Sequence, residues 1–355
     1  MNILVMEGDG IGPEIVRATL SVLRQADRKF GLDLAFDSVP IGLSALQAHG
    51  TTMPPESLEA ARNSQGVILG PISHNSYPPA AEGGVNPSGI LRKSLDLYGN
   101  IRPARTRPAF PPPCGKEFDI VIVRENTEGF YSDRSMHMGP GEIMPTPDLA
   151  LSIRKVSRTG STRIVEMAFA QARARPRKKV TCVHKGNVLR LSDGLFLECA
   201  REVAARYPDI EYNEQLVDSM AALLVRDAGS FDVIVTTNMF GDILSDQASE
   251  LSGSLGLAAS LNVGTKHAVA QAQHGSAPDI AGRDIANPSS LIGSAAMLMT
   301  WLGDSHGDTR FTAAGTAIEK ALDDTISSGA ARTRDLGGEY GTQAFAAAVA
   351  GRLGA

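Results

Sequence analysis

Short apolar runs alternate with helix-like segments along the chain. The first run, Asn2 to Glu7, ends at the glycines of GDGIGPE, where Pro13 suits the first turn of a helix. Helix-spaced apolar residues follow, and further strand candidates lie at 34–36 and 66–69. The same rhythm returns in FDIVIVREN, KKVTCVHKGNV, IEYNEQLVD and FDVIVTTNMFGD. This alternation predicts an α/β fold with a parallel or mixed sheet.

Polar residues stand where several of these predicted strands end. They are Arg124, Lys185, Asp218 and Asn238. Ligands of open α/β sheets bind beyond the carboxyl ends of the strands, so chemistry is expected at these four positions. Two stretches, 74–88 and 105–116, are rich in Pro or Gly and are predicted to be irregular loops.

Composition excludes several classes of function. A chain of 355 residues can bury a large core, as one large domain or two connected ones, and a net charge of -5 argues against a general polyanion binder. Cys114, Cys182 and Cys199 show no disulfide or zinc spacing, so we interpret them as reduced packing residues. The first residues, MNILVMEGDG, do not show a basic region followed by a long apolar stretch, and the sequence contains no apolar run of about 18 residues. We expect a soluble, cytoplasmic protein with no nucleic-acid or membrane partner.

Carboxylates suggest a metal site. Asp242 and Asp246 are four residues apart on a predicted helix, so both side chains can project from one face. A divalent cation bound through oxygen atoms would explain this pair of like charges, and Asp218 offers a third carboxylate. A solvated helix face is the more common explanation for an isolated pair of this kind.

Arginines and two further side chains suit an acidic substrate. Arg92, Arg102 and Arg124 lie near element ends, and guanidinium groups bind carboxylates in bidentate fashion. Lys185 and Tyr131 have the chemistry of a base and an acid. Without further context, ordinary surface positions explain the three arginines better, and Lys185 and Tyr131 are each a weak signal on their own.

The stretch from His274 to Pro288 is a candidate nucleotide loop. It collects Gly, Ser, Pro and Asn before an apolar helix, and Asp279 can accept hydrogen bonds from a ribose diol, which favours NAD over NADP. A long structural turn is the alternative. The opening GDGIGPE lacks the G-x-G-x-x-G spacing, so spacing alone gives it no cofactor role.

Eight motifs in order carry a family resemblance over nearly the whole chain. They are GDGIGPE, LDLYGNIRP, VRENTEGFY, HKGNVL, VDSMAALLV, NMFGDILSD, HGSAPDIAG and DLGGEYGT. Together they resemble the isocitrate and isopropylmalate dehydrogenase family of β-decarboxylating enzymes. The resemblance implies an isopropylmalate dehydrogenase-like fold, which is not a Rossmann fold, with two α/β domains and a cleft between them. It places residues 1–100 and 255–355 in a large cofactor-binding domain, and residues 101–254 in a smaller domain with the dimer contact.

The resemblance also implies a shared active site in a homodimer. Arg92, Arg102 and Arg124 match the arginines that hold the malate part of the substrate. Asp242, Asp246 and Asp218 match the Mg²⁺ or Mn²⁺ ligands, and Asp218 and Lys185 would come from the second subunit. The residues that match contacts to NAD are Asn187, His274, Gly275, Ser276, Ala277, Pro278, Asp279 and Asn287.

The implied reaction is oxidation followed by decarboxylation. Lys185 would assist removal of the hydroxyl proton of a 2-hydroxy acid, and the hydride would leave for the nicotinamide. The 2-oxo acid would then lose its β-carboxylate as carbon dioxide. Tyr131 would help to protonate the resulting enolate, while the metal acts as a Lewis acid.

Residues before Arg92 bear on the choice of substrate. Isopropylmalate enzymes are leucine-rich there, whereas this chain has Asn86 and Ser88, and it lacks at Gly89 the arginine of homoisocitrate enzymes. A buried amide or hydroxyl without a partner costs roughly 1–3 kcal/mol. We therefore expect a polar substituent, as in isocitrate, tartrate or D-malate, with 3-isopropylmalate as the alternative and a catalytically silent binding protein as the alternative of another class.

Two features depart from the family pattern. Gln271 stands where the family usually has a glutamate, which puts one acidic contact to the cofactor or neighbouring backbone in question. The loop at 74–84 matches no family member, so the resemblance implies no role for it.

Overall fold

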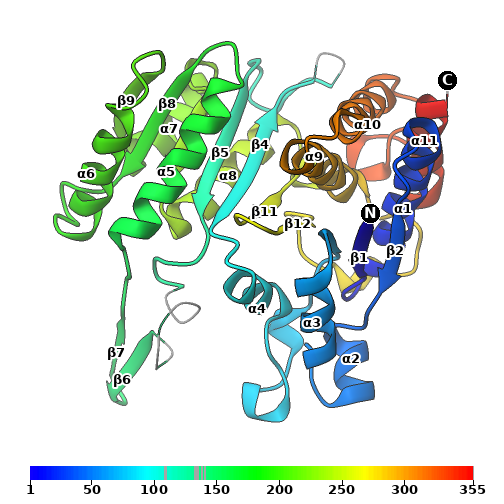
Figure 1. Ribbon diagram of the computed structural model, residues 1–355, viewed down its shortest axis with the longest axis horizontal. Coiled ribbons are helices and arrows are strands. Elements are labelled where there is room, and N and C mark those ends of the chain that lie inside the picture. The colour runs from blue at the N-terminus through cyan, green and yellow to red at the C-terminus, as the bar shows by residue number, and fades with distance from the viewer. Residues whose placement is uncertain (108–109, 132–135, 137–138, 140, 355) are drawn as a thin grey trace.

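The computed structural model describes residues 1–107, 110–131, 136, 139 and 141–354. Within these residues ten strands form one continuous sheet, in the order β2-β1-β3-β12-β11-β4-β5-β10-β8-β9 (Figure 1). In that order the strands are β2 (Ala35–Ser38), β1 (Asn2–Met6), β3 (Gly66–Leu69), β12 (Ala268–Gln271), β11 (Leu261–Val263), β4 (Gly99–Arg105), β5 (Asp119–Glu125), β10 (Val233–Thr236), β8 (Lys179–His184) and β9 (Glu211–Leu216).

The sheet is mixed, as expected from the sequence. β5, β10, β8 and β9 are mutually parallel, so the polar residues at their carboxyl ends share one edge. β11 is antiparallel to both β12 and β4, and β4 is antiparallel to β5. In this order the first five strands, β2 to β11, come from residues 2–69 and 261–271. The other five, β4 to β9, come from residues 99–236 in the middle of the chain. We propose that the two domains meet near β4, where the expected boundary at residue 100 falls.

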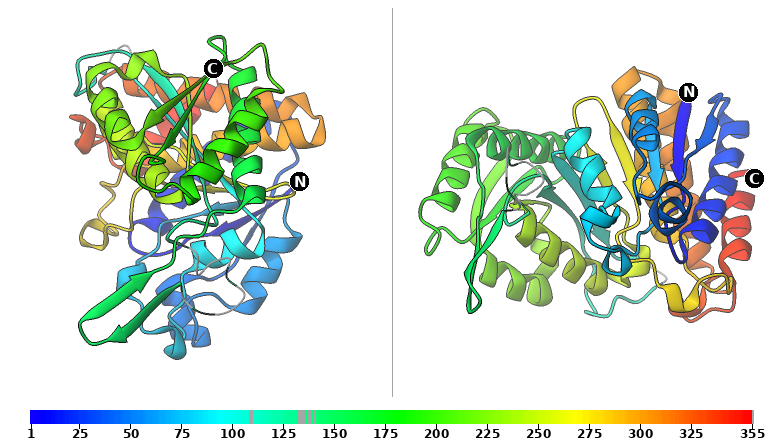
Figure 2. Two further views of the ribbon diagram at one scale, coloured as in Figure 1. Left: turned by 90° about the vertical axis from the view of Figure 1, so that its left-hand side faces the viewer. Right: turned by 90° about the horizontal axis from the view of Figure 1, so that it is seen from below.

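Helices cover both faces of the sheet (Figures 1 and 2). One face carries α1 (Gly12–Phe30), α5 (Arg158–Arg173), α6 (Ser192–Ala204), α9 (Ser289–His306), α10 (Thr309–Ser327) and α11 (Thr342–Gly354). The other carries α2 (Gly42–His49), α3 (Pro55–Asn63), α4 (Pro87–Ser94), α7 (Val217–Asp227) and α8 (Asn238–Ser252).

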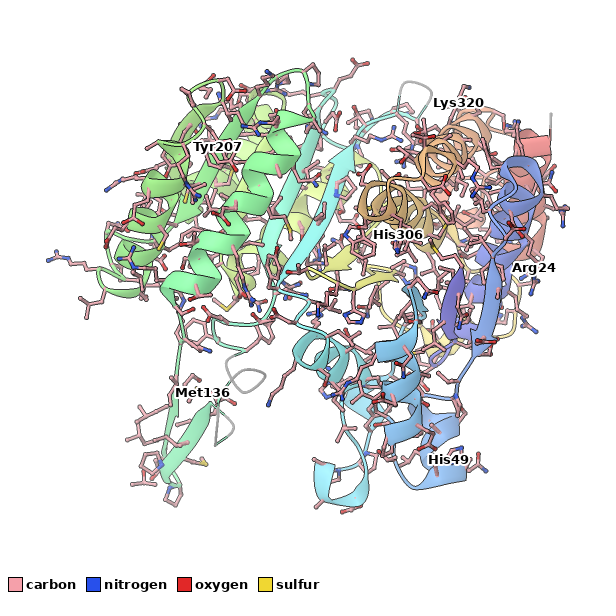
Figure 3. All side chains as sticks on the ribbon, viewed as in Figure 1. Arg24, His49, Met136, Tyr207, His306 and Lys320 are labelled. Carbon is pink, nitrogen blue, oxygen red and sulfur yellow. The ribbon has the colours of Figure 1, made fainter. Side chains whose placement is uncertain are left out.

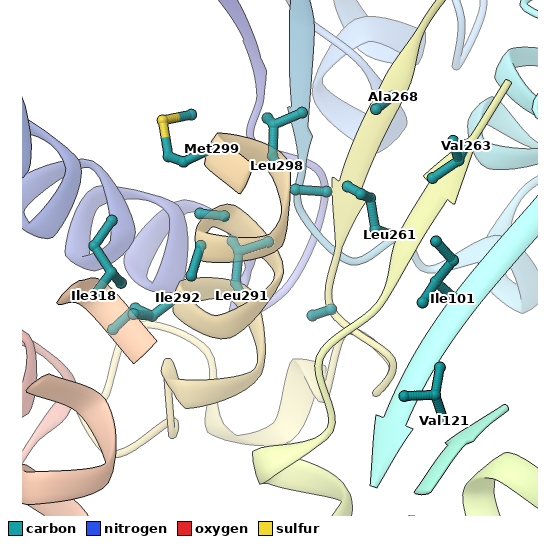
Figure 4. Close-up of a cluster of buried hydrophobic side chains, with 14 of the residues drawn as sticks. Ile101, Val121, Leu261, Val263, Ala268, Leu291, Ile292, Leu298, Met299 and Ile318 are labelled. Carbon is teal, nitrogen blue, oxygen red and sulfur yellow. The ribbon is translucent and has the colours of Figure 1, made fainter. Parts of the chain in front are cut away.

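Burial on both faces explains why the strands are apolar throughout. In β1, Ile3 and Val5 pack towards α1 and α9, whereas Leu4 and Met6 pack towards α3. Such strands show a continuous apolar run instead of an alternating pattern. The core is continuous across the middle of the sheet, where side chains of β4, β11 and α9 meet (Figure 4).

Phe169 on α5 is expected to be a major contributor to stability. It is fully buried, and its ring centroid lies 4.9 Å from that of Tyr207 and 6.2 Å from that of Tyr212. Phe169→Ala should lower the free energy of unfolding by about 3–5 kcal/mol, because it removes this contact and leaves a cavity. Urea unfolding measures the loss. Phe169→Leu, which refills part of the space, should cost clearly less, and equal costs for the two variants would contradict a packing role.

A two-stranded arm projects from the molecule and was not predicted. β6 (Glu142–Thr146) and β7 (Leu149–Ser152) pair only with each other among the described residues. In Figure 3 the side chains of the arm, next to the label of Met136, are separated from most of the other side chains. Its apolar residues are therefore exposed: Ile143, Met144, Leu149 and Leu151, with Ile153 just beyond.

Two cysteines are buried and free, as expected for packing residues. Cys182 and Cys199 are fully buried, and Cys114 is partly buried. Burial raises the pKa of the Cys182 thiol, so this side chain is chemically inert. Among the described helices, none combines the length and the apolar character needed to cross a bilayer.

Candidate active site

Two carboxylates on α8 meet one arginine of β4. Asp242 and Asp246 lie one helical turn apart, which confirms the predicted helical pair. Nη1 of Arg102 is 3.1 Å from Oδ1 of Asp242 and 3.2 Å from Oδ1 of Asp246. Burial and the charge of Arg124 lower the pKa of Arg102 to about 10, which leaves it protonated at neutral pH. The carboxylates of Asp242 and Asp246 are thus both directed towards the buried guanidinium group of Arg102.

Arg124 approaches Asp242 from the neighbouring strand β5. Its Nη1 atom forms an ion pair with Asp242, and its Nε and Nη2 atoms donate to Oδ1 of Asn238 at 3.0 and 2.7 Å. Gly241 leaves room for this arginine, because a Cβ at that position would lie 2.7 Å from side-chain carbons of Arg124. The glycine of GDILSD is therefore a packing requirement of the site.

Positive charge controls the ionisation of Asp242. Burial raises the pKa of this carboxyl, but the charges of Arg124, Arg102 and Arg92 outweigh burial and bring the pKa below its usual value. The hydroxyl of Tyr131, 3.3 Å from Oδ2, acts in the same direction as the arginines. Asp242 is therefore a carboxylate at neutral pH, among the three arginines expected to hold a substrate.

The third predicted metal ligand, Asp218, and the predicted base, Lys185, lie together in another part of the molecule. Lys185 follows β8, and Asp218 lies in the first turn of α7. Nζ of Lys185 is 2.5 Å from Oδ1 of Asp218, and this hydrogen bond lowers the pKa of Asp218. In the described part of the chain, no three acidic, histidine or cysteine side chains are close enough to hold one metal ion. Asp218 therefore does not complete a site with Asp242 and Asp246 within one subunit.

A polar cavity lies beside Arg102. Its volume is about 200 Å³, and Arg92, Arg102 and Gln271 contribute to its wall. The other lining residues are Pro71, Ile72, Ser260, Ala272, Gln273, His274 and Gly275. Burial lowers the pKa of His274, so its ring is neutral at neutral pH. The cavity thus joins two of the predicted substrate arginines to the start of the predicted cofactor loop.

The predicted cofactor loop, 274–279, is built on the N-terminal glycines. The backbone N–H of Ile11 donates to the carbonyl oxygen of Ser276 at 2.8 Å. Gly10 has a φ of +57°, and a Cβ there would lie 2.0 Å from the same oxygen. The hydroxyls of Ser73 and Ser276 are 2.8 Å apart. GDGIGPE therefore supports the loop, a role that its spacing alone did not reveal.

The other predicted cofactor residues divide into two groups. Asp279 is exposed at the end of the loop, and Asn287 donates from Nδ2 to Oδ2 of Asp335 at 2.8 Å. Asn187 instead lies on the exposed turn after β8, next to Lys185. A single subunit therefore separates Asn187, Lys185 and Asp218 from the loop.

Comparison with known proteins gives a consistent result. Residues 2–349 match the sequence profile described as isocitrate/isopropylmalate dehydrogenase. The chain is 40% identical over 354 residues to the 3-isopropylmalate dehydrogenase of Methanothermobacter thermautotrophicus, covering 99% of this chain and 98% of that protein. It is 41% identical over 349 residues to the isocitrate/homoisocitrate dehydrogenase of Thermus thermophilus, covering 98% and 97%.

A solved structure agrees with the sequence relatives. Isocitrate dehydrogenase from Methylococcus capsulatus superimposes with a TM-score of 0.87 at 39% identity, covering 99% of both chains. The chain belongs to the isocitrate/isopropylmalate dehydrogenase family. It is accordingly a decarboxylating dehydrogenase with the isopropylmalate dehydrogenase-like fold, as the eight ordered motifs implied. The family as a whole uses NAD and a divalent metal.

Asn86 and Ser88 have partners within this family fold. Oδ1 of Asn86 accepts a hydrogen bond from the N–H of Gly89 at 3.0 Å and caps α4. The hydroxyl of Ser88 donates to Oε1 of Gln271 at 3.0 Å. The expectation that these two groups would be buried without partners is therefore wrong, because the fold itself satisfies them. Their presence alone does not select a polar substrate.

The sequence analysis missed a set of buried amides close to the polar cavity. Asn100, Asn126 and Asn262 are each at most 1% exposed. Nε of Arg102 donates to Oδ1 of Asn100 at 2.5 Å, and Asn126 donates to Oδ1 of Asn262 at 3.0 Å. An asparagine inside a short apolar strand, as in GNIRP and SLNV, is the signal that would have identified them, because such a buried amide needs a partner.

A second cavity lies on the opposite face of β4. Its volume is about 290 Å³, and its wall includes Ile101, Val121, Leu261 and Trp301. These side chains are mainly apolar, and no predicted site residue lines the cavity. Of these two cavities, only the smaller, polar one is lined by predicted site residues.

Proposed function

We propose that this enzyme oxidises and decarboxylates a malate-type 2-hydroxy-dicarboxylic acid, with NAD and Mg²⁺ or Mn²⁺ as cofactors. The observation that carries the proposal is the convergence of three arginines on one ionised acid. Arg92, Arg102 and Arg124 all act on Asp242, and two of them line a cavity of the size of a small acid. Guanidinium groups suit the two carboxylates of such a substrate.

The acids of α8 fit a divalent cation. Asp242 is ionised, Asp246 is half exposed, and both offer the oxygen donors that Mg²⁺ and Mn²⁺ prefer. Asp218 of a second subunit would supply the third carboxylate. When bound, the metal would stabilise negative charge on the substrate oxygens as a Lewis acid.

The loop at 274–279 fits the adenosine part of NAD. Asp279 is exposed and can accept hydrogen bonds from a ribose diol, and its charge would repel the additional phosphate of NADP. NAD would accept the hydride in the oxidation step, and Asn187 of the second subunit would approach the nicotinamide.

Two side chains would handle protons. Lys185 from a second subunit would assist removal of the proton from the 2-hydroxyl group. The Tyr131 hydroxyl, already within 3.3 Å of Asp242, would help to deliver a proton to the carbon that loses carbon dioxide. Arg102 and Arg124 hold the substrate so that the bond to its β-carboxylate is placed for cleavage.

A homodimer would bring these groups together. Lys185 and Asp218 form no metal-binding group with Asp242 in one subunit, while the helices that carry the two acids expose apolar residues, Val225 on α7 and Ile243 on α8. The exposed arm of β6 and β7 offers a second apolar surface. We propose that these surfaces meet their counterparts in a second copy, so that each cleft contains residues of both chains.

A finer proposal concerns the substituent that the substrate carries on its malate core. We favour a polar one, as in isocitrate, tartrate or D-malate, because arginine, glutamine, serine and histidine side chains line most of the cavity. The alternative is 3-isopropylmalate, which the naming of the archaeal relative favours.

A panel of acids tests the proposal. We expect NADH formation with isocitrate, tartrate or D-malate and Mg²⁺, complete loss on adding a chelator, and recovery on restoring Mg²⁺. A clear preference for 3-isopropylmalate would reverse our ordering of substrates. Calorimetric binding of NAD without turnover of any acid would instead indicate a catalytically silent member of the family.

A further inference from the structure

Gln273, which follows β12, contacts one of the proposed metal ligands. Its Nε2 atom is 2.7 Å from Oδ1 of Asp246 and 3.4 Å from the hydroxyl oxygen of Ser249, both on α8. The backbone N–H of Gln273 donates to the hydroxyl of Ser290 at the start of α9, 3.2 Å away. Because Gln273 belongs to the segment 255–355 and Asp246 to the segment 101–254, this side-chain bond joins the two proposed domains.

The contact with Asp246 determines which way the amide of Gln273 points. Nη1 of Arg102 is 3.2 Å from the same Oδ1 atom, and a guanidinium can only donate, so this oxygen is an acceptor. Gln273 must therefore present its NH₂ group to Asp246, and its own Oε1 atom must point away from that carboxylate.

This orientation leaves the oxygen of Gln273 unsatisfied. Oε1 is buried and accepts no hydrogen bond from any described residue. A buried acceptor without a donor opposes stability, and buried polar groups in folded proteins usually have a partner. An apolar side chain of similar length would avoid this cost. A role in folding alone therefore does not account for an amide at this position.

Gln273 and Arg102 together hold one oxygen of Asp246 and leave the other open. Both donate to Oδ1, whereas Oδ2 accepts no hydrogen bond within the described part of the chain, and the side chain is half exposed. Arg102 alone is a weak constraint, because Nη1 shares its two hydrogens among three acceptors, which include Asp242 at 3.1 Å and Ser245 at 2.8 Å. The shorter of the two bonds to Asp246 comes from Gln273.

We infer that Gln273 is a positioning residue of the proposed metal site, where its NH₂ group holds Oδ1 of Asp246 so that Oδ2 is presented to the cation. The inference rests on the proposed function, in which Asp242 and Asp246 are metal ligands. A carboxylate that is held in advance loses less conformational freedom on binding a cation than one that rotates freely. Gln273 is neutral, so it orients Asp246 without cancelling its negative charge.

The variant Gln273→Met tests this bond, because it keeps the length of the side chain and removes the donor. The probe is Mn²⁺, whose free concentration is measured by electron paramagnetic resonance while the whole enzyme is titrated without NAD or acid. We expect the Kd for Mn²⁺ to rise about ten- to a hundredfold, since Asp246 is no longer held. In assays at saturating Mn²⁺, kcat should change by less than about threefold.

Ser249→Ala is the matched control, since it removes the weaker partner of Gln273 and leaves the bond to Asp246. Its Kd for Mn²⁺ should stay within about threefold of that of the unchanged enzyme. Gln273→Asn keeps the amide but is one methylene shorter, so its NH₂ group cannot reach Asp246 and the Kd should rise as well. This second variant tests the bond if Gln273→Met does not unfold cooperatively.

The outcomes separate two failures. If the unchanged enzyme binds Mn²⁺ and both variants of Gln273 bind it equally tightly, the role of Gln273 is overturned and the proposed function stands. A lower Tm of these variants with an unchanged Kd would assign Gln273 to folding alone. An unchanged enzyme that forms NADH without any divalent cation would overturn the metal dependence of the proposed function, and this inference with it.

Discussion

Asp242→Asn is expected to abolish NADH formation, lowering kcat/KM by at least about three orders of magnitude. The amide keeps the shape of the side chain but removes the negative charge that Arg92, Arg102 and Arg124 surround. It is also a much weaker ligand for a hard divalent cation than a carboxylate. Steady-state rates at saturating Mg²⁺, with the best acid of the panel, measure the effect.

Glu250→Gln is the matched control for this variant. Glu250 lies on the same helix α8, is exposed, and accepts a hydrogen bond from the N–H of Leu255 at 2.8 Å, which an amide oxygen can also accept. Its kcat/KM should not change. If Asp242→Asn kept more than about a tenth of the activity, Asp242 would not be a metal ligand of the reaction.

A randomly paired mixture of two inactive variants is expected to regain about a quarter of the normal activity, and the purified mixed dimer about half. In a dimer of one Asp242→Asn subunit and one Lys185→Ala subunit, one cleft combines the intact Asp242 with the intact Lys185, and the other cleft lacks both. Random pairing makes about half of the dimers mixed, and each mixed dimer has one working cleft of two. Co-expression with two different affinity tags yields the mixed dimer for assay.

Each variant expressed alone serves as the control and should remain inactive. A mixed dimer as inactive as its parents would mean that Lys185 and Asp242 of the same subunit act together. That result would contradict the proposed sharing of clefts, although it would leave the family assignment intact.

Most of the strands that the sequence predicted are buried on both faces, although the edge strands β2 and β9 were predicted as well. The apolar run at 66–69 is β3, and FDIVIVREN contains β5. β4, β11 and β12 were missed because Asn100, Arg102, Asn262 and Gln271 interrupt their apolar pattern. Those residues line the polar cavity or are hydrogen-bonded to residues that do, so a prediction that depends on hydrophobicity missed the strands that carry them. The arm of β6 and β7 was missed because it has no buried face.

The sequence predicted those parts of the candidate site whose residues lie close together in the chain. Asp242 and Asp246 are one helical turn apart, so the helix alone brings them to one face. The contact of Arg102 with Asp242 joins residues 140 positions apart, and that of Ser88 with Gln271 joins residues 183 apart. The periodicity of hydrophobic residues does not indicate which residues so far apart in the sequence will be in contact. The error over Ser88 arose in this way, because its partner lies on a strand that the pattern did not reveal.

The arm of β6 and β7 has a consequence for how the enzyme is made. Both of its outer edges and its apolar side chains lie open in a single subunit, as far as the described residues extend. Two strands alone are barely stable in water, and open edges attract other chains. In the proposed dimer, a newly synthesised chain would expose this arm until a second subunit covered it. Folding and assembly would then be coupled, and a chain that found no second subunit would be prone to nonspecific association and proteolysis.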